Sequence, residues 1–168
     1  MLTLKKKFSD SFNFVFNKTV ILRVDLNVPM EDQIISDNTR IIKVIPTIKK
    51  LLEQKAKIII ISHYGRPKGK WSDNLSLKFL IKDFEALTEK KVGFIDSNVK
   101  NLKKIDINEQ FKNFDILILE NIRFYPEEEK NIDKFSKTIA SLGDIFINDC
   151  FSCSHRAHSS ISGVPKYL

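Results

Sequence analysis

The chain has 168 residues, and its 28 Lys and Arg residues against 21 Asp and Glu give a net charge of +7. The length fits one domain of roughly 100–200 residues, and a hydrophobic content of 42% argues against disorder. No apolar run reaches the roughly 18 residues of a membrane helix, and Met1–Phe8 has no apolar signal-peptide core. Two cysteines exclude a disulfide framework. We therefore expect a cytoplasmic protein.

Apolar runs alternate with helical periods along the chain. A first strand is predicted at Lys18–Asp25, and a helix follows at Asn38–Gln54, where apolar residues recur at helical spacing. Strands separated by helices predict βαβ units. We therefore expect an α/β fold, with a three-layer α/β/α arrangement around a mainly parallel, Rossmann-like sheet in a single domain. The other predicted elements are strands at Lys57–Ser62, Val92–Ile95, Asp115–Leu119 and Asp144–Asn148 and helices at Ser76–Lys90 and Ile132–Leu142.

Three details concern the ends and the continuity of the predicted helices. Pro46 lies inside the first helical pattern and predicts a kink or a break, but the apolar period continues beyond it, so we keep one helix. Asp37 or Ser36 is expected to be the N-cap of that helix. Gly143 suits the C-cap of the last predicted helix.

Four predicted strands run directly into polar clusters at their carboxyl ends. In an open α/β sheet, ligands bind outside these ends, and in a parallel sheet the ends all lie on one edge. Clusters that are tens of residues apart in the sequence should therefore meet in space. Arg40 joins them from the first turn of its helix, where free N–H groups also favour anions. The clusters are Arg23–Pro29, Ser62–Gly69, Glu120–Phe124 and Asn148–His158.

The five arginines and three histidines of the chain all fall in or beside these clusters, whereas the 23 lysines are scattered. Scattered lysines indicate a solvated surface. Arginine offers a planar fork that binds carboxylate and phosphate, and several arginines at one edge suit a small molecule with several negative charges. Asp25 and Asn27 lie on one face of their strand and can bind a ligand hydroxyl. Arg23 is instead expected to be structural, in an ion pair with Asp25.

Other polar groups have simpler interpretations. Glu127–Glu129 are expected to decorate the start of the helix at Ile132. Cys150 and Cys153, with His155 close behind, are expected to be two small loop residues; a redox pair remains open, whereas a zinc site lacks a fourth ligand. We expect no metal site. Neither a G-x-x-x-x-G-K-[ST] nor a G-x-G-x-x-G motif is present, so no nucleotide-binding loop is predicted.

Taken together, the clusters resemble the N-terminal domain of the phosphoglycerate kinase family. That domain carries R-V-D-[FL]-N-V-P, S-H-L-G-R-P-x-G, L-E-N-[LI]-R-F and N-D-A-F-[GS]-[TA]-[AS]-H-R-A-H in this order. The resemblance covers roughly residues 18–168. The matching segments are Arg23–Pro29, Ser62–Gly69, Leu119–Phe124 and Asn148–His158, with Asp37–Arg40 between the first two.

The resemblance implies reversible phosphoryl transfer between 1,3-bisphosphoglycerate and ADP in glycolysis, with 3-phosphoglycerate as the small anionic partner. The acceptor carboxylate is already ionised, so no general base is required. The complete enzyme uses Mg-ATP and Mg-ADP, and we expect this chain to bind no nucleotide, metal or other cofactor. Arg40 has the catalytic role of neutralising charge on the phosphoryl group. The substrate-binding residues that the resemblance implies are Asp25, Asn27, Arg40, His63, Arg66, Arg123 and Arg156.

The chain departs from the family chiefly in length. We expect residues 1–168 to be the N-terminal phosphoglycerate-binding domain, truncated or completed by a separate C-terminal nucleotide domain, and inactive on its own. Two alternatives stay open, a folded inactive remnant and a basic polyanion-binding domain suggested by the net charge of +7. The preferred interpretation includes no nucleic-acid or membrane partner. Ser152 stands where many members have glycine, and it would strain the loop if the backbone there has a positive φ.

Overall fold

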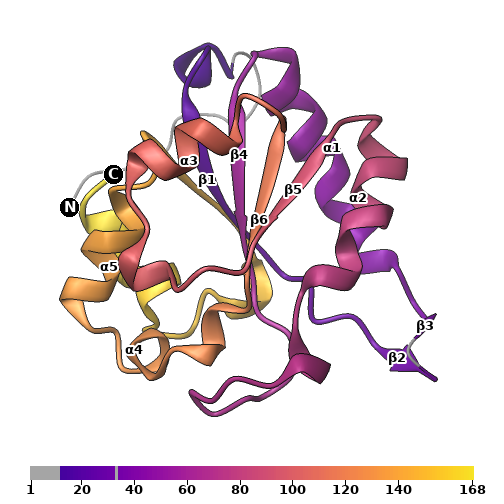
Figure 1. Cartoon of the computed structure of the whole chain (residues 1–168), viewed down its shortest axis with the longest axis vertical. Coiled ribbons are helices and arrows are strands. Elements are labelled where there is room, and N and C mark those ends of the chain that lie inside the picture. The colour runs from indigo at the N-terminus through magenta and orange to yellow at the C-terminus, as the bar shows by residue number, and fades with distance from the viewer. Residues whose placement is uncertain (1–11, 33) are drawn as a thin grey trace.

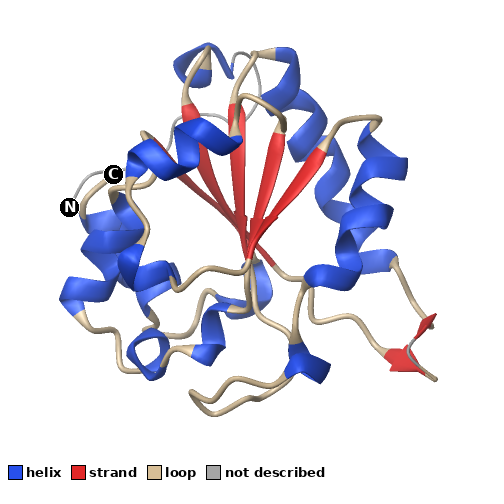
Figure 2. Ribbon diagram, viewed as in Figure 1, coloured by secondary structure: helices blue, strands red, loops and turns tan. Residues whose placement is uncertain are grey.

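The computed structural model describes residues 12–32 and 34–168. Its centre is a five-stranded sheet with the strand order β5-β6-β4-β1-β7, and helices cover both faces (Figures 1 and 2). All four pairings between neighbouring strands are parallel. The predicted three-layer α/β fold is confirmed. The strands are β1 (Thr19–Val24), β4 (Lys57–Ile61), β5 (Val92–Ile95), β6 (Ile116–Leu119) and β7 (Ile145–Asp149).

Two pairs of helices form the outer layers. α1 (Thr39–Glu53) and α2 (Ile81–Thr88) cover one face of the sheet, and α3 (Lys104–Gln110) and α5 (Asp133–Ala140) cover the other (Figure 1). A one-turn helix, α4 (Pro126–Glu129), precedes α5, and β2 (Met30–Glu31) pairs with β3 (Ile34–Ile35) in a short antiparallel ribbon. The remaining turns are η1 (Phe12–Val15), η2 (Asp73–Leu75), η3 (Lys78–Leu80), η4 (Val99–Asn101), η5 (Ile122–Phe124), η6 (Phe151–Cys153), η7 (Ser159–Gly163) and η8 (Val164–Lys166).

The sheet separates two apolar cores. Successive side chains of a strand point to opposite faces, so Leu22 of β1 packs with α1, while its neighbour Ile21 packs with the α5 side. All four isoleucines of β4 are fully buried, as expected for a parallel strand that is covered on both faces. The core thereby fixes the strand register, and the register fixes where each strand ends.

The predicted strands agree with the structure to within one residue at each end. Other predictions need correction. The helix predicted at Ser76–Lys90 is α-helical only over Ile81–Thr88 and is preceded by two short turns. Neither α3 nor the β2–β3 ribbon was predicted. Pro46 does stay inside one continuous helix, where its ring lies on the exposed side.

The helix ends also differ from the predictions. The N-cap of α1 is Asn38 and not Asp37, although the Asp37 carboxylate accepts a hydrogen bond of 2.8 Å from the backbone N–H of Thr39. α5 ends at a C-cap of Ser141, so Gly143 is not the cap. A Cβ at Gly143 would lie 2.6 Å from Cγ1 of Ile21, and glycine is needed there because the backbone passes so close to β1. Among residues 12–32 and 34–168, no helix is both long enough and apolar enough to span a membrane.

Candidate functional site

The segments that follow β1, β4, β6 and β7 meet at the carboxyl edge of the sheet, below the strands in Figure 1. Hydrogen bonds connect them. The backbone N–H of Leu26 donates to Oγ of Ser62 at 3.0 Å, and the N–H of Gly65 donates to Oδ1 of Asn27 at 2.8 Å. The Asn121 side chain donates to the carbonyl of Tyr64 at 2.7 Å. Three clusters that are far apart in the sequence therefore form one continuous surface.

Asp25 connects the fourth cluster and the helix α1 to this surface. Its Oδ2 accepts hydrogen bonds from Arg40 and from Oγ of Ser152, the latter at 2.6 Å. The predicted ion pair between Asp25 and Arg23 is therefore wrong, because Asp25 pairs with Arg40. Ser152 does not have a positive φ, so the strain considered for this position is absent, and its hydroxyl instead holds Asp25.

Arg23 is structural, as predicted, but its partners differ from the prediction. The side chain is 1% exposed, and its Nε donates to Oγ of Ser160 at 3.0 Å. Ser160 in turn donates through its hydroxyl and its backbone N–H to the carboxylate of Glu128, at 2.5 and 2.9 Å. A buried carboxylate thus faces a buried guanidinium through one serine, which offsets the cost of burying both charges.

Glu128 corrects a second interpretation. The three glutamates do not decorate the start of α5 but form their own turn, α4, and Glu128 is fully buried. Burial raises the pKa of its carboxyl group, and the hydrogen bonds from Ser160 oppose that rise. His158, whose Nδ1 lies 3.8 Å from Oε1 of Glu128, is half-buried, and its pKa is lowered by burial and then by Arg123.

His63 is neutral at physiological pH. Burial, followed in order by the charges of Arg23, Arg123 and Arg156, lowers its pKa to about 3. Its Nδ1 lies 3.1 Å from a terminal nitrogen of Arg23. Because a guanidinium can only donate hydrogen bonds, Nδ1 must accept, and Nε2 must carry the proton. His63 therefore presents an N–H donor without adding a charge.

Arg123 is buried at the same edge and keeps donor capacity. It is 6% exposed, and one terminal nitrogen lies 3.4 Å from the carbonyl of Gly65. Its Nε has no hydrogen-bond partner among the described residues and lies 3.6 Å from Oε1 of Glu129. Burial lowers the pKa of Arg123, and Arg156 is the next largest cause. A buried guanidinium with spare N–H groups is suited to binding a carboxylate or a phosphate.

Arg66 and Arg156 are exposed in the segments after β4 and η6. Arg156 lies close enough to lower the pKa values of His63 and Arg123. In the part of the chain that the structure describes, Arg66 has no hydrogen bond or ion pair with another predicted site residue. Of the seven predicted residues, Asp25, Asn27 and Arg40 are in contact with one another. His63 and Arg123 reach the same edge through Arg23 and Gly65. Arg156 acts on them through its charge, and Arg66 shares only the loop that follows β4.

The sequence placed Glu120 and Asn121 in the third cluster but gave no indication that they hold these loops together. Asn121 is fully buried and donates to the carbonyls of both Tyr64 and Leu75. Glu120 accepts from the backbone N–H of Leu77 at 2.9 Å and from the hydroxyl of Ser76 at 2.7 Å. Their signals in the sequence were that they follow a buried strand directly and that they belong to the motif Leu119–Phe124.

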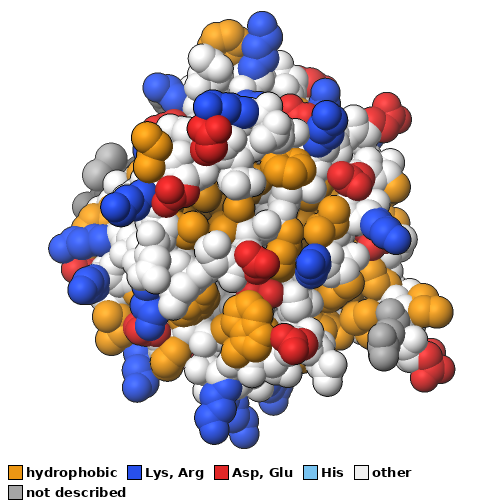
Figure 3. Space-filling model, in the orientation of Figure 1, with side chains coloured by type: hydrophobic (Ala, Val, Ile, Leu, Met, Phe, Trp, Pro, Cys, Tyr) orange, Lys and Arg blue, Asp and Glu red, His pale blue; other side chains and the backbone are white. Residues whose placement is uncertain are grey.

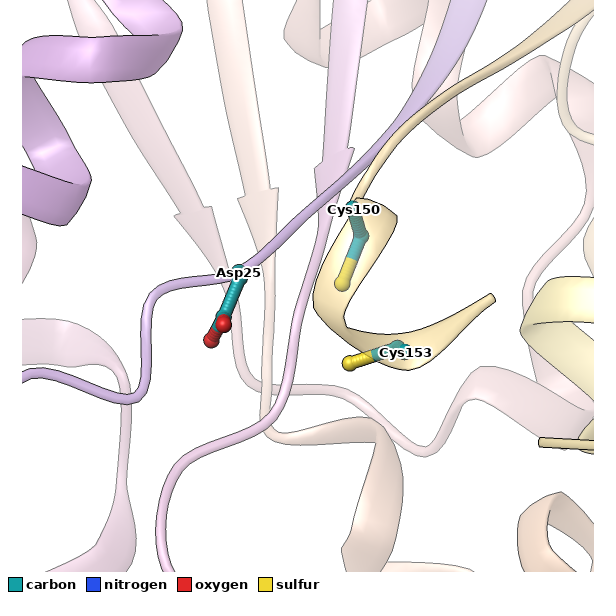
Figure 4. Close-up of side chains that lie close together, drawn as sticks. All are labelled: Asp25, Cys150 and Cys153. Carbon is teal, nitrogen blue, oxygen red and sulfur yellow. The ribbon is translucent and has the colours of Figure 1, made fainter. Parts of the chain in front are cut away.

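One cluster at this edge has a metal-ligand composition. A carboxylate oxygen of Asp25 and the sulfur atoms of Cys150 and Cys153 all lie within 4.8 Å of one another (Figure 4). Mg²⁺ prefers oxygen ligands in octahedral geometry. A donor set with two sulfurs does not fit it.

The fold and this edge place the chain among the α/β proteins whose ligand site lies outside the carboxyl ends of a parallel sheet. The model of the family described as "Phosphoglycerate kinase" matches residues 10–168, and the chain therefore belongs to the phosphoglycerate kinase family.

The chain is also similar to individual phosphoglycerate kinases. Phosphoglycerate kinase of Wolbachia pipientis wMel is 51% identical over 154 residues, and that of Orientia tsutsugamushi strain Ikeda is 47% identical over 154 residues. The solved structure of phosphoglycerate kinase from Coxiella burnetii matches 92% of the chain with a TM-score of 0.79 and 35% identity. The Pyrococcus horikoshii OT3 enzyme matches 90% with a TM-score of 0.74 and 32% identity. The chain spans about 38% of the length of each of these proteins.

Proposed function

We propose that residues 1–168 form one domain that binds 3-phosphoglycerate and 1,3-bisphosphoglycerate as the substrate half of a phosphoglycerate kinase. The observation that carries the proposal is Arg123, a buried guanidinium whose Nε has no hydrogen-bond partner among the described residues. It stands beside neutral His63 and within the field of Arg156. Such convergence of like charges is costly without an anion, and the family's substrate has a phosphate and a carboxylate.

The proposed roles follow the chemistry of each side chain. Arg66, Arg123 and Arg156 bind the anionic groups, and the Nε2–H of His63 donates a hydrogen bond without further charge. Asp25 and Asn27 bind the hydroxyl, and each is already held in place, Asp25 by Ser152 and Arg40 and Asn27 by the N–H of Gly65. Arg40, which is partly exposed at the start of α1, neutralises the phosphoryl group during transfer.

The reaction is phosphoryl transfer between 1,3-bisphosphoglycerate and ADP, a step of glycolysis, which is consistent with a cytoplasmic protein. Because the acceptor is an ionised carboxylate, positioning and charge neutralisation suffice. Magnesium and the nucleotide belong to the remainder of the enzyme, a C-terminal nucleotide domain, since the donor set of Asp25, Cys150 and Cys153 does not suit Mg²⁺. We infer that these 168 residues alone do not turn over.

Calorimetric titration with 3-phosphoglycerate tests this function. We expect saturable binding that weakens with salt, and Arg123→Ala should weaken it about 10-fold or more, because a charge-assisted hydrogen bond contributes about 1.5–3 kcal/mol. Lys112→Ala, on an exposed side chain paired with Glu109, is the control and should bind like the wild type. Arg40→Ala should affect turnover of a complete enzyme more than binding. Absence of heat at millimolar ligand, with circular dichroism intact, would contradict the proposal and favour a folded remnant.

A basic polyanion-binding domain is the second candidate. It requires Lys and Arg gathered on one face with aromatic residues between them. On the face in Figure 3 the basic side chains are spread over many elements and interleaved with acidic ones, which favours the small-anion function. A gel shift with RNA or DNA and a steep salt dependence would reverse this preference.

A further inference from the structure

Cys150 and Cys153 are placed as a dithiol. Both are free cysteines in the turn after β7, and the backbone N–H of Cys153 donates to the carbonyl of Cys150 at 3.1 Å. Such a turn keeps the two Cα atoms within about 7 Å, a separation at which a disulfide can close. Both sulfur atoms point to the inner side of the turn, toward Asp25, and lie within 4.8 Å of each other (Figure 4).

The groups around the two sulfurs are unequal. A terminal nitrogen of Arg23 lies 3.9 Å from Sγ of Cys153. Cys153 is also the more exposed of the two, at 5% against 1% for Cys150. The hydroxyl of Ser152 lies 3.7 Å from each sulfur and donates its proton to Asp25. The pair therefore has one thiol beside a cation and one in a more closed environment.

The pKa values of the two thiols are shifted in opposite directions. The interaction with the Cys150 thiol, together with Arg23, Ser152 and Arg123, lowers the pKa of Cys153 to about 5 against the opposing effect of burial. The same interaction and burial raise the pKa of Cys150. The charged groups that face the pair are Arg23 from β1, Arg123 from η5 and Asp25. A thiolate beside cations is the reactive form of cysteine.

We propose that Cys150 and Cys153 are a peroxide-sensitive dithiol that closes to an intramolecular disulfide, with Cys153 as the attacking thiolate and Cys150 as the resolving thiol. The inference rests on the thiols and their surroundings and does not depend on the proposed function. A divalent cation at the same atoms is disfavoured, because it would displace Arg40 and Ser152 from Asp25 and lie beside Arg23.

The chemistry balances with hydrogen peroxide as the oxidant. The Cys153 thiolate attacks one peroxide oxygen, an S–O bond forms while the O–O bond breaks, and the released hydroxide takes a proton to become water. The Cys150 sulfur then attacks the sulfenic sulfur, the S–S bond forms while the S–O bond breaks, and the hydroxyl leaves as water with the Cys150 proton. The two sulfurs lose two electrons together, and the peroxide gains them. A small oxidant is required because both side chains are nearly buried.

Peroxide oxidation of the full chain, followed by alkylation under denaturing conditions and intact-mass spectrometry, tests the proposal. The wild type should lose two hydrogen atoms and both alkylation sites, and dithiothreitol should restore them. Cys150→Ser should stop at a sulfenic acid on Cys153 that dimedone traps, and Cys153→Ser should react at least about 10-fold more slowly at pH 6, where an ordinary thiol is almost entirely protonated.

The same measurements in urea give the unfolded reference. We expect the rate advantage of Cys153 at pH 6 to disappear there, because Arg23 and Arg123 no longer face the sulfur. The proposal is overturned if the folded wild type forms no intramolecular disulfide, or if Cys153→Ser reacts as fast as Cys150→Ser. Equal rates for the folded and the urea-unfolded wild type at pH 6 would also overturn it, since the fold would then confer no reactivity.

Discussion

Lowering the pH should destabilise the fold through His63. The imidazole is 6% exposed and contacts Arg23, so protonation would bury a cation among arginines. The pKa of His63 is lowered from 6.5 to about 3. Below pH 6.5 the unfolded chain therefore binds a proton that the folded chain does not bind. The stability that neutral His63 provides is present above pH 6.5 and is lost as the pH falls toward 3.

The magnitude follows from these two pKa values. Between them, each pH unit removes about 1.4 kcal/mol from the free energy of unfolding. A shift from pH 7.5 to pH 5 should thus remove about 2 kcal/mol through His63 alone, since roughly 1.5 of those pH units lie below the unfolded pKa. Other groups also contribute to the pH dependence, including Glu128, whose pKa is raised by burial, and His158, whose pKa is lowered by burial, so the contribution of His63 has to be isolated by difference.

His63→Gln is the matched variant. The glutamine carbonyl can accept from Arg23 as Nδ1 does, and the amide does not titrate. We would measure urea unfolding of both proteins by circular dichroism at pH 7.5 and pH 5. The wild type should lose about 2 kcal/mol more than the variant between these pH values. Parallel loss in the two proteins, within about 0.5 kcal/mol, would refute the assignment of this pH dependence to His63.

Two further substitutions test the packing around the site. Glu128→Ala should lower the free energy of unfolding, measured with urea at pH 7.5, by about 3 kcal/mol or more, because it leaves Arg23 without its buried counter-charge. The control Glu129→Ala, on a half-exposed side chain, should lower it by less than about 1 kcal/mol. Equal losses in the two variants would contradict the network of Arg23, Ser160 and Glu128. Gly143→Ala should lower the free energy of unfolding by about 1–3 kcal/mol, since its Cβ would overlap Ile21. Thermal unfolding measures this loss, and an unchanged midpoint would show that the backbone can move away.

The sheet could be predicted because its strands are short apolar runs that the structure buries on both faces. The run of four isoleucines in β4 leaves little alternative to a central parallel strand. α3 was missed because Lys104–Gln110 has only one buried residue, Ile107, and so has no apolar period. Helix ends were displaced where a tertiary contact competes with local capping, as at Gly143 against Ile21.

The meeting of the polar loops could also be predicted, because parallel strands end on one edge. The pairing within the site could not. Asp25 is two residues from Arg23, yet Arg23 turns toward Ser160 and Glu128, which are more than 100 residues away. The packing of the whole core determines which buried polar groups lie close enough to pair. The sequence does not indicate that η7 brings Ser160 close to Arg23 of β1.

Two arginines at this edge, Arg23 and Arg123, therefore differ in their roles. Arg23 is fully partnered, through Ser160 to Glu128 and through its terminal nitrogen to His63, so it has little left to offer a ligand. It instead fixes the tautomer of His63 and, after burial, is the largest cause of its lowered pKa. Arg123 has an Nε that makes no hydrogen bond among the described residues and lies 3.6 Å from Glu129, and burial and then Arg156 lower its pKa. Arg23 therefore helps burial to keep His63 neutral, whereas Arg123 stays close to the like charge of Arg156, which a bound anion would offset.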